Sequence, residues 1–229
     1  MIKNKKGQLI VIEGVDGSGK QTHTNLLYQY LKDKGEKVIK ISYPRYDKES
    51  SAMVKLYLSG AFGEDPETIS PYIASTFYTA DRYASYKEDY EEFLNDGGIV
   101  LADRYTTSNM VHQAGKIKDQ AEKKKFLDWL WDYEFNLFSL PIPDQVFFLN
   151  IPPEINQQLI KNRKNKITGE TQKDIHENSS QHLIDAYKSA LELIADYDWT
   201  EIKCVKNESL RSIDDIQAEI RQAVFEKRT

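Results

Sequence analysis

The fold is decided by the stretch Gln8-Leu9-Ile10-Val11-Ile12 and by the glycine-rich turn after it, Gly14-Val15-Asp16-Gly17-Ser18-Gly19-Lys20. The first run is apolar and has the length of a buried strand. From Lys20 to Lys34, apolar residues recur at helical spacing, and Gly35 is a typical stop. The glycines allow a tight turn whose N–H groups converge on an anion, and the helix N-terminus favours negative charge. The sequence therefore predicts a loop that holds the phosphates of a nucleoside triphosphate.

The turn has the spacing Gly-x-x-x-x-Gly-Lys, and Lys20 would reach the terminal phosphates as a point charge. Gln21, with Thr22 beside it, stands where a Ser or Thr hydroxyl usually binds Mg²⁺. We therefore predict that Asp16, or a carboxylate from elsewhere, contacts the metal or its water. A glycine turn without a ligand is the alternative, and the flanking strand and helix disfavour it. The predicted nucleotide-binding residues are Gly14, Gly17, Ser18, Gly19, Lys20, Gln21 and Thr22.

The rest of the chain alternates short apolar runs with longer amphipathic ones, which is typical of βαβ units and a mostly parallel sheet. We expect an α/β fold: a single P-loop NTPase-type domain over residues 1–229, with a central parallel five-stranded sheet flanked by helices. The polar segment 161–174 is too hydrophilic for the core and is predicted to be a lid. Further strands are expected at residues 38–41, 99–102, 145–149 and 201–205, and helices at residues 20–34, 52–58, 70–94, 116–138, 175–197 and 213–227.

Composition sets limits on the partners. The 229 residues include 31 Lys and Arg against 36 Asp and Glu, a net charge of −5 that argues against broad nucleic-acid binding. The longest apolar run, Val146-Phe147-Phe148-Leu149, is far too short for a membrane span. Because Cys204 is the single cysteine, no internal disulfide can form, and a cytoplasmic protein is expected. No spacing of Cys and His residues suggests a zinc site.

Charged residues follow two of the predicted strands at the points where the strands end. Residues 38–41 lead into Pro44-Arg45-Tyr46, and residues 99–102 lead into Asp103-Arg104-Tyr105. Ligands of parallel α/β sheets bind beyond the carboxyl ends of the strands, so both segments should lie on the same edge as the glycine turn. Two arginines there can clamp a second phosphate. A salt bridge at the sheet edge is the alternative for each arginine.

The predicted helix over residues 72–83 offers a surface for a flat ligand. Tyr78 and Arg82 are four residues apart and therefore share a helix face. An aromatic ring to stack on and a forked donor for the ring edge are what a nucleobase requires. Core packing is the alternative, because aromatic residues at helical spacing are usually buried.

These motifs, in this order and spacing, resemble those of thymidylate kinases, and the resemblance covers essentially the whole chain. It implies phosphorylation of dTMP to dTDP by ATP with Mg²⁺, in dTTP biosynthesis. It also implies a homodimer formed through helices that flank the sheet. The matching segments are Gly14 to Lys20, Tyr43-Pro44-Arg45-Tyr46, Tyr78-x-x-x-Arg82, residues 103–109, and Asp174-Ile175-His176-Glu177. A candidate dimer interface, with core packing as the alternative, is the stripe Leu127, Leu130, Trp131, Glu134, Phe135 and Phe138.

The resemblance also implies a role for each matching residue. Tyr78 would stack on thymine, where the family usually has Phe, and Arg82 and Asn109 would contact the base edge. Pro44 would border the pocket near the 5-methyl group. The residues implied at the acceptor phosphate are Arg45, Arg104 and Asp103, and those at the metal are Asp16 and Glu177. The implied catalytic residues are Lys20, Asp16, Arg104 and a cation from the lid.

Three departures from the family pattern bear on the site. Gly17 stands where one branch of the family has an arginine, and members without it supply a cation from the lid. His112 lies where an aromatic residue usually sits beneath the sugar, and His176 replaces another frequent aromatic. Both histidines are expected to line the acceptor pocket, without a catalytic role. The candidate lid cations are Lys161, Arg163, Lys164 and Lys166, of which we favour Arg163, with a solvated basic loop as the alternative.

Two other functions are compatible with a phosphate loop. A deoxynucleoside kinase would need a carboxylate base beside the acceptor 5′-hydroxyl. A regulatory nucleotide-binding protein would use hydrolysis to drive a partner, and it would have no need of the paired arginines or the stacking face. A nucleoside monophosphate kinase accounts for all of these features.

Overall fold

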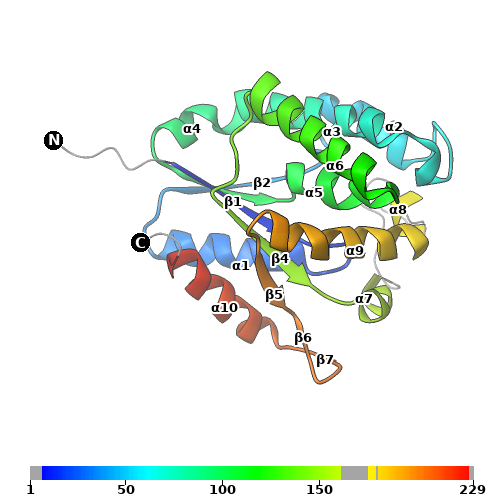
Figure 1. Cartoon of the computed structure of the whole chain (residues 1–229). Coiled ribbons are helices and arrows are strands. Elements are labelled where there is room, and N and C mark those ends of the chain that lie inside the picture. Colours follow the sequence, from blue (N-terminus) through cyan, green and yellow to red (C-terminus); the bar gives the residue numbers. More distant parts are fainter. Residues whose placement is uncertain (1–6, 161–174, 179, 227–229) are drawn as a thin grey trace.

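The computed structural model describes residues 7–160, 175–178 and 180–226, with the backbone alone for 157–160 and 177–178. Its centre is a parallel sheet of five strands in the order β2-β3-β1-β4-β5 (Figure 1). The expected α/β fold with a five-stranded parallel sheet is therefore confirmed. The strands are β1 (Gln8–Glu13), β2 (Val38–Ser42), β3 (Ile99–Asp103), β4 (Gln145–Asn150) and β5 (Thr200–Lys203).

Helices α1 (Lys20–Asp33) and α10 (Ile213–Glu226) cover one face of the sheet, below it in Figure 1. Successive strand side chains point to opposite faces, so Ile10 of β1 turns to this side. It joins a buried cluster with Leu27 of α1 and Ile220 of α10. Each fully buried aliphatic side chain contributes roughly 1.5–3 kcal/mol, and this layer holds α1 and the loop before it in place.

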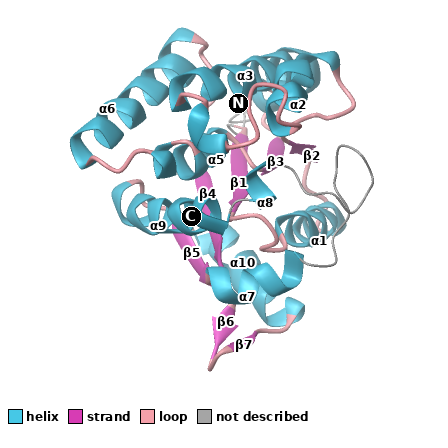
Figure 2. Cartoon of the chain, turned by 90° about the vertical axis from the view of Figure 1, so that its right-hand side faces the viewer, coloured by secondary structure: helices cyan, strands magenta, loops and turns pink. Residues whose placement is uncertain are grey.

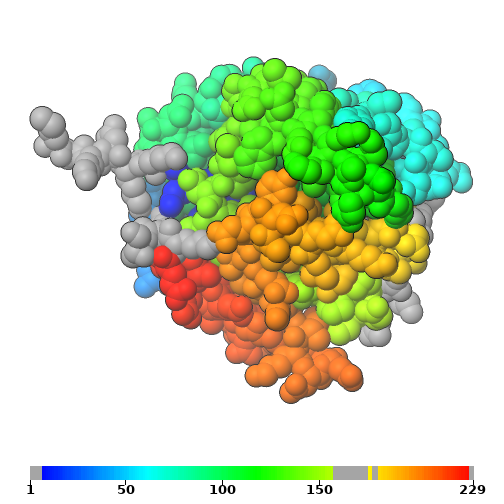
Figure 3. Space-filling model, in the orientation of Figure 1, coloured from blue at the N-terminus to red at the C-terminus, as the bar shows by residue number. Residues whose placement is uncertain are grey.

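The opposite face is covered by α5 (Thr106–His112), α6 (Gln120–Trp131) and α9 (Ser180–Asp196). Val11, which follows Ile10 on β1, belongs to this second cluster together with residues of α6 and α9. Figure 3 shows the surfaces of α6 (green) and α9 (orange) side by side, and Lys123 bridges them to Glu192 at 2.8 Å. Outside this layer, α3 (Pro71–Ser85) packs against α5 and α6.

The remaining elements are short. The α-helices among them are α2 (Ala52–Leu58), α4 (Glu91–Asn95), α7 (Pro153–Ile160) and α8 (Ile175–Asn178). Three 3₁₀ turns lie at Glu49–Ser51, Pro66–Thr68 and Ala114–Lys116, and π-helical turns at Tyr86–Tyr90 and Asp132–Leu137. Strands β6 (Val205–Lys206) and β7 (Ser209–Leu210) form a hairpin. In the described part of the chain, no helix has the length and apolarity that crossing a membrane requires.

The register of the strands places their carboxyl ends together. Asp103 of β3 is paired with Ile12 of β1 on one side and with Ser42 of β2 on the other. The chain therefore leaves β1, β2 and β3 at the same edge, as the sequence predicts. Figure 2 views the molecule from this side, with α5, α7 and α8 grouped around the strand ends.

The helix predictions need three corrections. The helix expected over 70–94 is interrupted by the π turn at Tyr86–Tyr90, and the helix expected over 116–138 begins only at Gln120 and ends in a π turn. The short helix α5 was not expected at all, because its Thr-Thr-Ser-Asn start has no apolar periodicity. Tertiary hydrogen bonds stabilise it: Thr106 donates to Glu134 at 2.5 Å, and Thr107 donates to Glu13 at 2.6 Å.

The stripe considered as a dimer interface is largely core. Leu130 and Glu134 are fully buried, and Phe135 is nearly so. These three residues belong to the layer that α6 forms with the sheet and α3. For them the alternative, core packing, is therefore the correct interpretation. The predicted lid, 161–174, lies outside the described residues.

Candidate active site

The glycine turn between β1 and α1 has the backbone that its sequence predicts. Gly17 and Gly19 both have φ of 83°, in the left-handed region that side chains rarely adopt. A Cβ on Gly14 would stand 2.4 Å from Ser18 Oγ and 3.1 Å from the Leu149 carbonyl oxygen, so the loop closes only with glycine there. Helix α1 starts at Lys20 without a side-chain cap. Its first N–H groups therefore remain available to an anion.

Lys20 folds back over its own loop. Its Nζ donates to the carbonyl oxygens of Gly14 at 2.6 Å and Val15 at 2.9 Å. Burial and the nearby Arg104 lower the pKa of Lys20 to about 7, against the opposing effect of the neighbouring carboxylates. A phosphate that replaced the two carbonyls would restore the full charge of the ammonium group.

Two more features of the loop fit an oxygen-rich ligand. Ser18 Oγ is buried without a hydrogen-bond partner among the residues described, and such orphaned groups cost free energy unless a ligand satisfies them. Asn156 of α7 donates to the Asp16 carbonyl and so fixes the tip of the loop. Gln21 and Thr22 are exposed on the first turn of α1, directly after the loop.

The ion pair between Asp16 and Arg104 joins the glycine loop to the end of β3. Arg104 has φ of 70°, a left-handed conformation that turns its side chain back toward the loop. Its guanidinium also lies 3.6 Å from the buried Glu13. Burial would raise the pKa of Asp16, but Arg104, then Lys20, hold it well below its usual range. Burial likewise opposes the charge of Arg104, and Asp16 and Glu13 nevertheless raise its pKa.

Glu13 connects the glycine loop to helix α5. One carboxylate oxygen accepts from the Gly14 N–H at 2.9 Å, and the other accepts from Thr107 at 2.6 Å and Ser108 at 2.8 Å. It therefore connects the last residue of β1 to the start of α5. Asp103 is also buried here. With Glu13 it contributes to the raised pKa of Arg104 and partly opposes the lowering of the pKa of Lys20.

Arg45 follows the cis Tyr43–Pro44 bond at the end of β2 and is only 8% exposed. Its Nε donates to Asp81 at 3.2 Å, and one Nη donates to Glu88 at 3.1 Å and Asp89 at 2.7 Å. The other Nη donates to Ser50 at 2.9 Å. These contacts use four of the five N–H donors of an arginine. The guanidinium is thus oriented by α3 and the π turn after it, and one of its five N–H donors makes no hydrogen bond to the described residues.

Arg82 is held by a buried carboxylate. Its Nε donates to Glu134 at 2.8 Å, and a terminal nitrogen donates to the other oxygen of the same carboxylate. Arg82 is 1% exposed and Glu134 is fully buried. Burial disfavours the charged form of Arg82, but Glu134 outweighs this effect and raises its pKa. Thr79 and Asn109 also donate to Glu134, at 3.0 Å and 3.4 Å.

Tyr78 lies one helical turn before Arg82, partly buried at the edge of this network. Its ring meets that of Tyr57 edge to face, with centroids 6.3 Å apart. Tyr57 in turn meets the His176 ring at 5.4 Å, and its hydroxyl lies 2.8 Å from His176 Nε2. The predicted stacking residue is therefore part of an aromatic wall that runs from α3 through α2 to α8.

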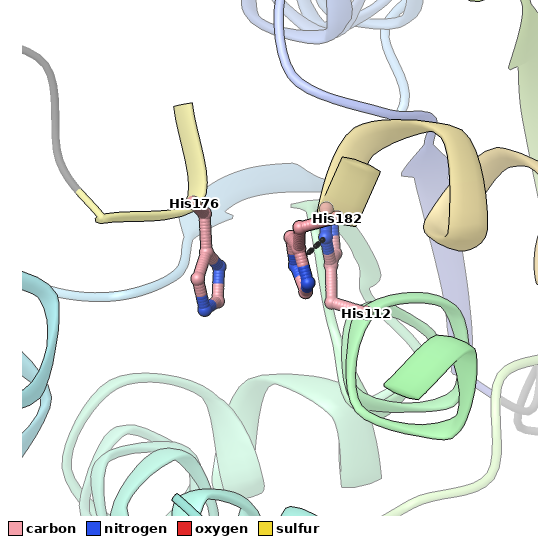
Figure 4. Close-up of side chains that lie close together, drawn as sticks. All are labelled: His112, His176 and His182. Atoms are coloured by element: carbon pink, nitrogen blue, oxygen red, sulfur yellow. Dashed lines mark hydrogen bonds between the residues drawn. The ribbon is translucent and has the colours of Figure 1, made fainter. Parts of the chain in front are cut away.

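His112 links this wall to the phosphate side. Its Nε2 lies 3.4 Å from Arg104, and its ring is stacked at 5.8 Å from that of His176 and at 5.5 Å from that of His182 (Figure 4). Burial is the main cause of a pKa well below 6.5 for both His112 and His176. The two histidines therefore stand as neutral rings between the base-side and phosphate-side residues.

Comparisons with known proteins identify the family. The thymidylate kinase family model matches residues 12–209, which is most of the chain. The chain belongs to the thymidylate kinase family. A probable thymidylate kinase of Pyrococcus horikoshii is 31% identical over 158 residues, 69% of this chain and 72% of that protein. The thymidylate kinase of Caldicellulosiruptor saccharolyticus is 28% identical over 221 residues, 96% of each chain.

The fold of a solved thymidylate kinase, from Candida albicans, is also similar. The two structures superpose with a TM-score of 0.70 at 20% identity, over 97% of this chain and 93% of the other. As a member of the thymidylate kinase family, this chain is a kinase that phosphorylates dTMP.

Several residues that build the thymidylate kinase site could not be identified from the sequence. Glu13, Asp81, Glu134 and His182 hold the predicted residues in position through buried contacts. The available signal was a charged residue in an otherwise apolar context: Glu13 ends a buried strand, and Glu134 interrupts the stripe on α6. Two predicted residues cannot be placed. Arg163 lies outside the described residues with the other lid cations, and so does the side chain of Glu177.

Proposed function

We propose that this chain transfers the γ-phosphoryl group of ATP, with Mg²⁺, to the phosphate of dTMP within one cleft at the carboxyl edge of the sheet. The observation that carries the proposal is the Asp16–Arg104 ion pair, because it joins a donor-binding loop to an acceptor-side strand end. We further propose that residues 1–229 form one nucleoside monophosphate kinase domain in which 161–174 is the lid.

The chemistry requires positioning and charge neutralisation more than a base, because the acceptor phosphate is already an anion. Two unit charges about 4 Å apart repel each other by roughly 4 kcal/mol at an effective dielectric of 20. Lys20 would neutralise the donor phosphates, and Arg104 and Arg45 the acceptor phosphate. Their fixed contacts with carbonyls and carboxylates keep all three side chains at the strand ends before a substrate arrives.

The loop also suits Mg²⁺, which prefers hard oxygen ligands and keeps several of its waters. Asp16 is ionised over the physiological pH range because its pKa is held low. Ser18 offers a buried hydroxyl for a phosphate oxygen or a metal-bound water. Bound Mg²⁺ would offset the charge on the phosphates. Arg104 and Asn156 would keep Asp16 in place for this role, because Arg104 donates to its carboxylate and Asn156 to its backbone carbonyl.

On the acceptor side, Tyr78 would stack on thymine and Arg82 would donate to the base edge, with Pro44 beside the 5-methyl group. The contacts with Glu134 leave one side of the Arg82 fork near Asn109 and the Tyr105 carbonyl oxygen, which lies 3.5 Å from Arg82 Nη1. Asn109, His112 and His176 would complete the pocket. The supporting observation is that these side chains form two sets of contacts. Arg82 and Asn109 both donate to Glu134, and Tyr78 contacts Tyr57, which contacts His176, whose ring is stacked with that of His112.

A substrate panel tests the proposal directly. Purified protein is incubated with ATP and Mg²⁺ and with dTMP, dUMP or thymidine, and ADP formation is measured. We expect rapid turnover with dTMP and none with thymidine, because the acceptor must bring its own phosphate to Arg45 and Arg104. Turnover with thymidine alone would instead support the deoxynucleoside kinase, and ATP hydrolysis independent of any acceptor would support the regulatory protein.

An arginine variant tests the base-side assignment. Arg82→Lys keeps a positive charge opposite Glu134 but lacks the planar fork. We expect the Kd for dTMP to rise about tenfold, the loss of one charge-assisted hydrogen bond, with an unchanged Kd for ATP. Arg211→Lys is the matched control, because Arg211 pairs with Glu219 at 2.6 Å beyond the sheet edge. An equal effect of Arg82→Lys on both ligands would contradict the assignment.

We also propose that the protein is a cytoplasmic homodimer. Large apolar side chains are exposed on α3 and at the end of the π turn that follows α6: Ile73, Tyr83 and Leu137 are 54%, 41% and 70% exposed. Burying them against a second copy is favourable. Sedimentation of the purified protein would give twice the monomer mass.

Cys204 is buried, and burial raises the pKa of its thiol to about 12, which keeps it unreactive.

A further inference from the structure

Three of the four histidines of the chain meet in one buried cluster. His112 comes from α5, His176 from α8 and His182 from α9, and all three are at most 5% exposed. Figure 4 shows the three rings gathered where these helices approach one another. One ligand nitrogen from each ring can be chosen such that all lie within 4.8 Å of one another. Imidazole is the commonest protein ligand for divalent transition metals.

The dimensions of the cluster match those of a zinc site. His112 Nδ1 and His182 Nε2 are 3.4 Å apart, and two nitrogens on one tetrahedral Zn²⁺ would be separated by about 3.3 Å. The ring centroids form a triangle with sides of 4.3, 5.5 and 5.8 Å. Rings bound to one such ion would have centroids about 5 Å apart. The rings would have to turn, because their present stacking does not point all three lone pairs at one centre.

A carboxylate already supports one ligand. Glu67 Oε1 lies 3.4 Å from His182 Nδ1, so the N–H there can donate to the carboxylate while Nε2 faces His112. A carboxylate behind a histidine is the usual outer support of a zinc ligand, because it fixes the tautomer and raises the basicity of the ring. Around the cluster, Arg104 and Lys116 bring positive charge and Asp16 brings negative charge.

We propose that His112, His176 and His182 form a binding site for a divalent transition metal of the Zn²⁺ class, with water in the fourth position. In the present hydrogen bond His112 Nδ1 carries the proton, because His182 Nδ1 donates to Glu67 and leaves His182 Nε2 as the acceptor. When the metal binds, this proton would move to His112 Nε2, so that both rings bind the ion as neutral imidazoles. The site is distinct from the proposed Mg²⁺ site, which has oxygen ligands on the glycine loop. It does not depend on which nucleotides the enzyme uses.

The sequence gives no complete zinc motif. His176 and His182 have the H-x5-H spacing of zinc ligands, but no cysteine pair accompanies them and His112 lies far away in the chain. Only the packing of α5 against α8 and α9 brings them together. The metal would pin these three helices to one another at the edge of the acceptor pocket.

Cobalt titration tests the site. Untagged, nucleotide-free full-length protein is titrated with Co²⁺, whose visible ligand-field absorption is intense only at low coordination number with nitrogen or sulfur ligands. We expect one equivalent of Co²⁺ with such a spectrum, and its loss on addition of one equivalent of Zn²⁺. A weak spectrum typical of oxygen ligands, or no saturable binding, would overturn the proposal.

Substitutions locate the ion. His182→Gln should weaken Co²⁺ binding at least tenfold, and Glu67→Gln should weaken it by up to about tenfold through the outer support alone. His23→Gln is the matched control, because His23 is a buried histidine of α1 that contacts Gln217 of α10, on the opposite face of the sheet from α5 and α9. Equal affinities for the wild type and both cluster variants would refute the site. Glu67 is partly exposed, so that variant folds and keeps the test decisive if His182→Gln does not.

Discussion

In the glycine loop, Lys20 donates to two neutral carbonyl oxygens, whereas at the acceptor edge Arg45, Arg82 and Arg104 each face at least one carboxylate. The two sets of partners respond differently to a phosphate. Carbonyl oxygens are weak competitors, so Lys20 can exchange them for a phosphate and recover its full charge. Carboxylates remain in place and share the arginine with the incoming anion.

The difference predicts two costs of substrate binding. On the proposed donor side, a nucleotide would replace only two neutral hydrogen bonds of Lys20. On the proposed acceptor side, carboxylates already set the direction of each guanidinium, and removing a buried carboxylate would leave an uncompensated charge. Stability should therefore depend on the acceptor-side partners, and turnover on the donor-side cation.

The strongest test of this contrast is Glu134→Gln. Removing the carboxylate leaves the buried charge of Arg82 without its counterion, a loss of about 3–5 kcal/mol in the free energy of unfolding. Urea denaturation followed by circular dichroism measures it. An equally stable variant would show that the pair contributes nothing to the fold.

A second test addresses the donor side. Lys20→Ala removes the cation from the phosphates and should lower kcat by about 10²–10³-fold, as the loss of one transition-state charge contact does. We expect no loss of Tm, because Lys20 donates only to carbonyl oxygens in the free protein and its removal also removes the cost of its buried charge. Retention of turnover within a few-fold of wild type would remove Lys20 from the chemistry.

The depressed pKa of Lys20 predicts a proton-linked binding step. At pH 8 a group of pKa about 7 is mostly neutral, and nucleotide phosphates favour its charged form. ATP binding at pH 8 should therefore take up about 0.9 of a proton at this site. Calorimetry in two buffers of different ionisation enthalpy measures the uptake. Lys20→Met should abolish the proton uptake that belongs to Lys20. Identical uptake in the variant would show that another group takes up the proton.

The same pKa fixes the sign of a stability effect. The folded-state pKa of Lys20, about 7, lies below the ordinary lysine value of 10.5, so the unfolded chain binds more protons between these two pH values. The cost of the buried charge is fully present below pH 7 and is relieved as the pH rises toward 10.5. The stability gap between wild type and Lys20→Met should narrow over that window.

The smallest expected effect comes from the exposed partner of Arg45. Glu88 is 60% exposed, and an ion pair in such a position contributes less than about 1 kcal/mol. Glu88→Gln should therefore leave the urea midpoint nearly unchanged, in contrast to Glu134→Gln. A loss of unfolding free energy as large as that of Glu134→Gln would contradict the distinction between buried and exposed carboxylate partners.

The two regions also differ in how far the sequence predicts them. The glycine loop is a local feature, since residues 14–20 contain the turn, the lysine and the start of the helix in one run. The shared carboxyl edge of the strands follows from their parallel arrangement, whereas the strand order comes from the structure alone. The acceptor side is assembled from α3, α5, the π turn after α6, and α8, so the sequence predicts Tyr78 and Arg82 but not the carboxylate that orients Arg82.

The same reason explains the errors in the helices. Helix α5 owes its formation to Glu13 and Glu134, which are remote in sequence from the threonines they accept from. Periodicity cannot detect a helix that is stabilised in this way. The π turns were missed because they preserve helical composition while they change the phase.

The π turn at Asp132–Leu137 makes the length of this segment matter as much as its residues. A π turn accommodates one residue more than an α-helical turn, and each residue of an α-helix rotates the next by about 100°. Deleting one residue there would shift Glu134 around the helix axis and away from Arg82. Among relatives, gaps and insertions in this stretch should therefore coincide with a change in the partner of the base-side arginine, whereas gaps before α6 should be neutral.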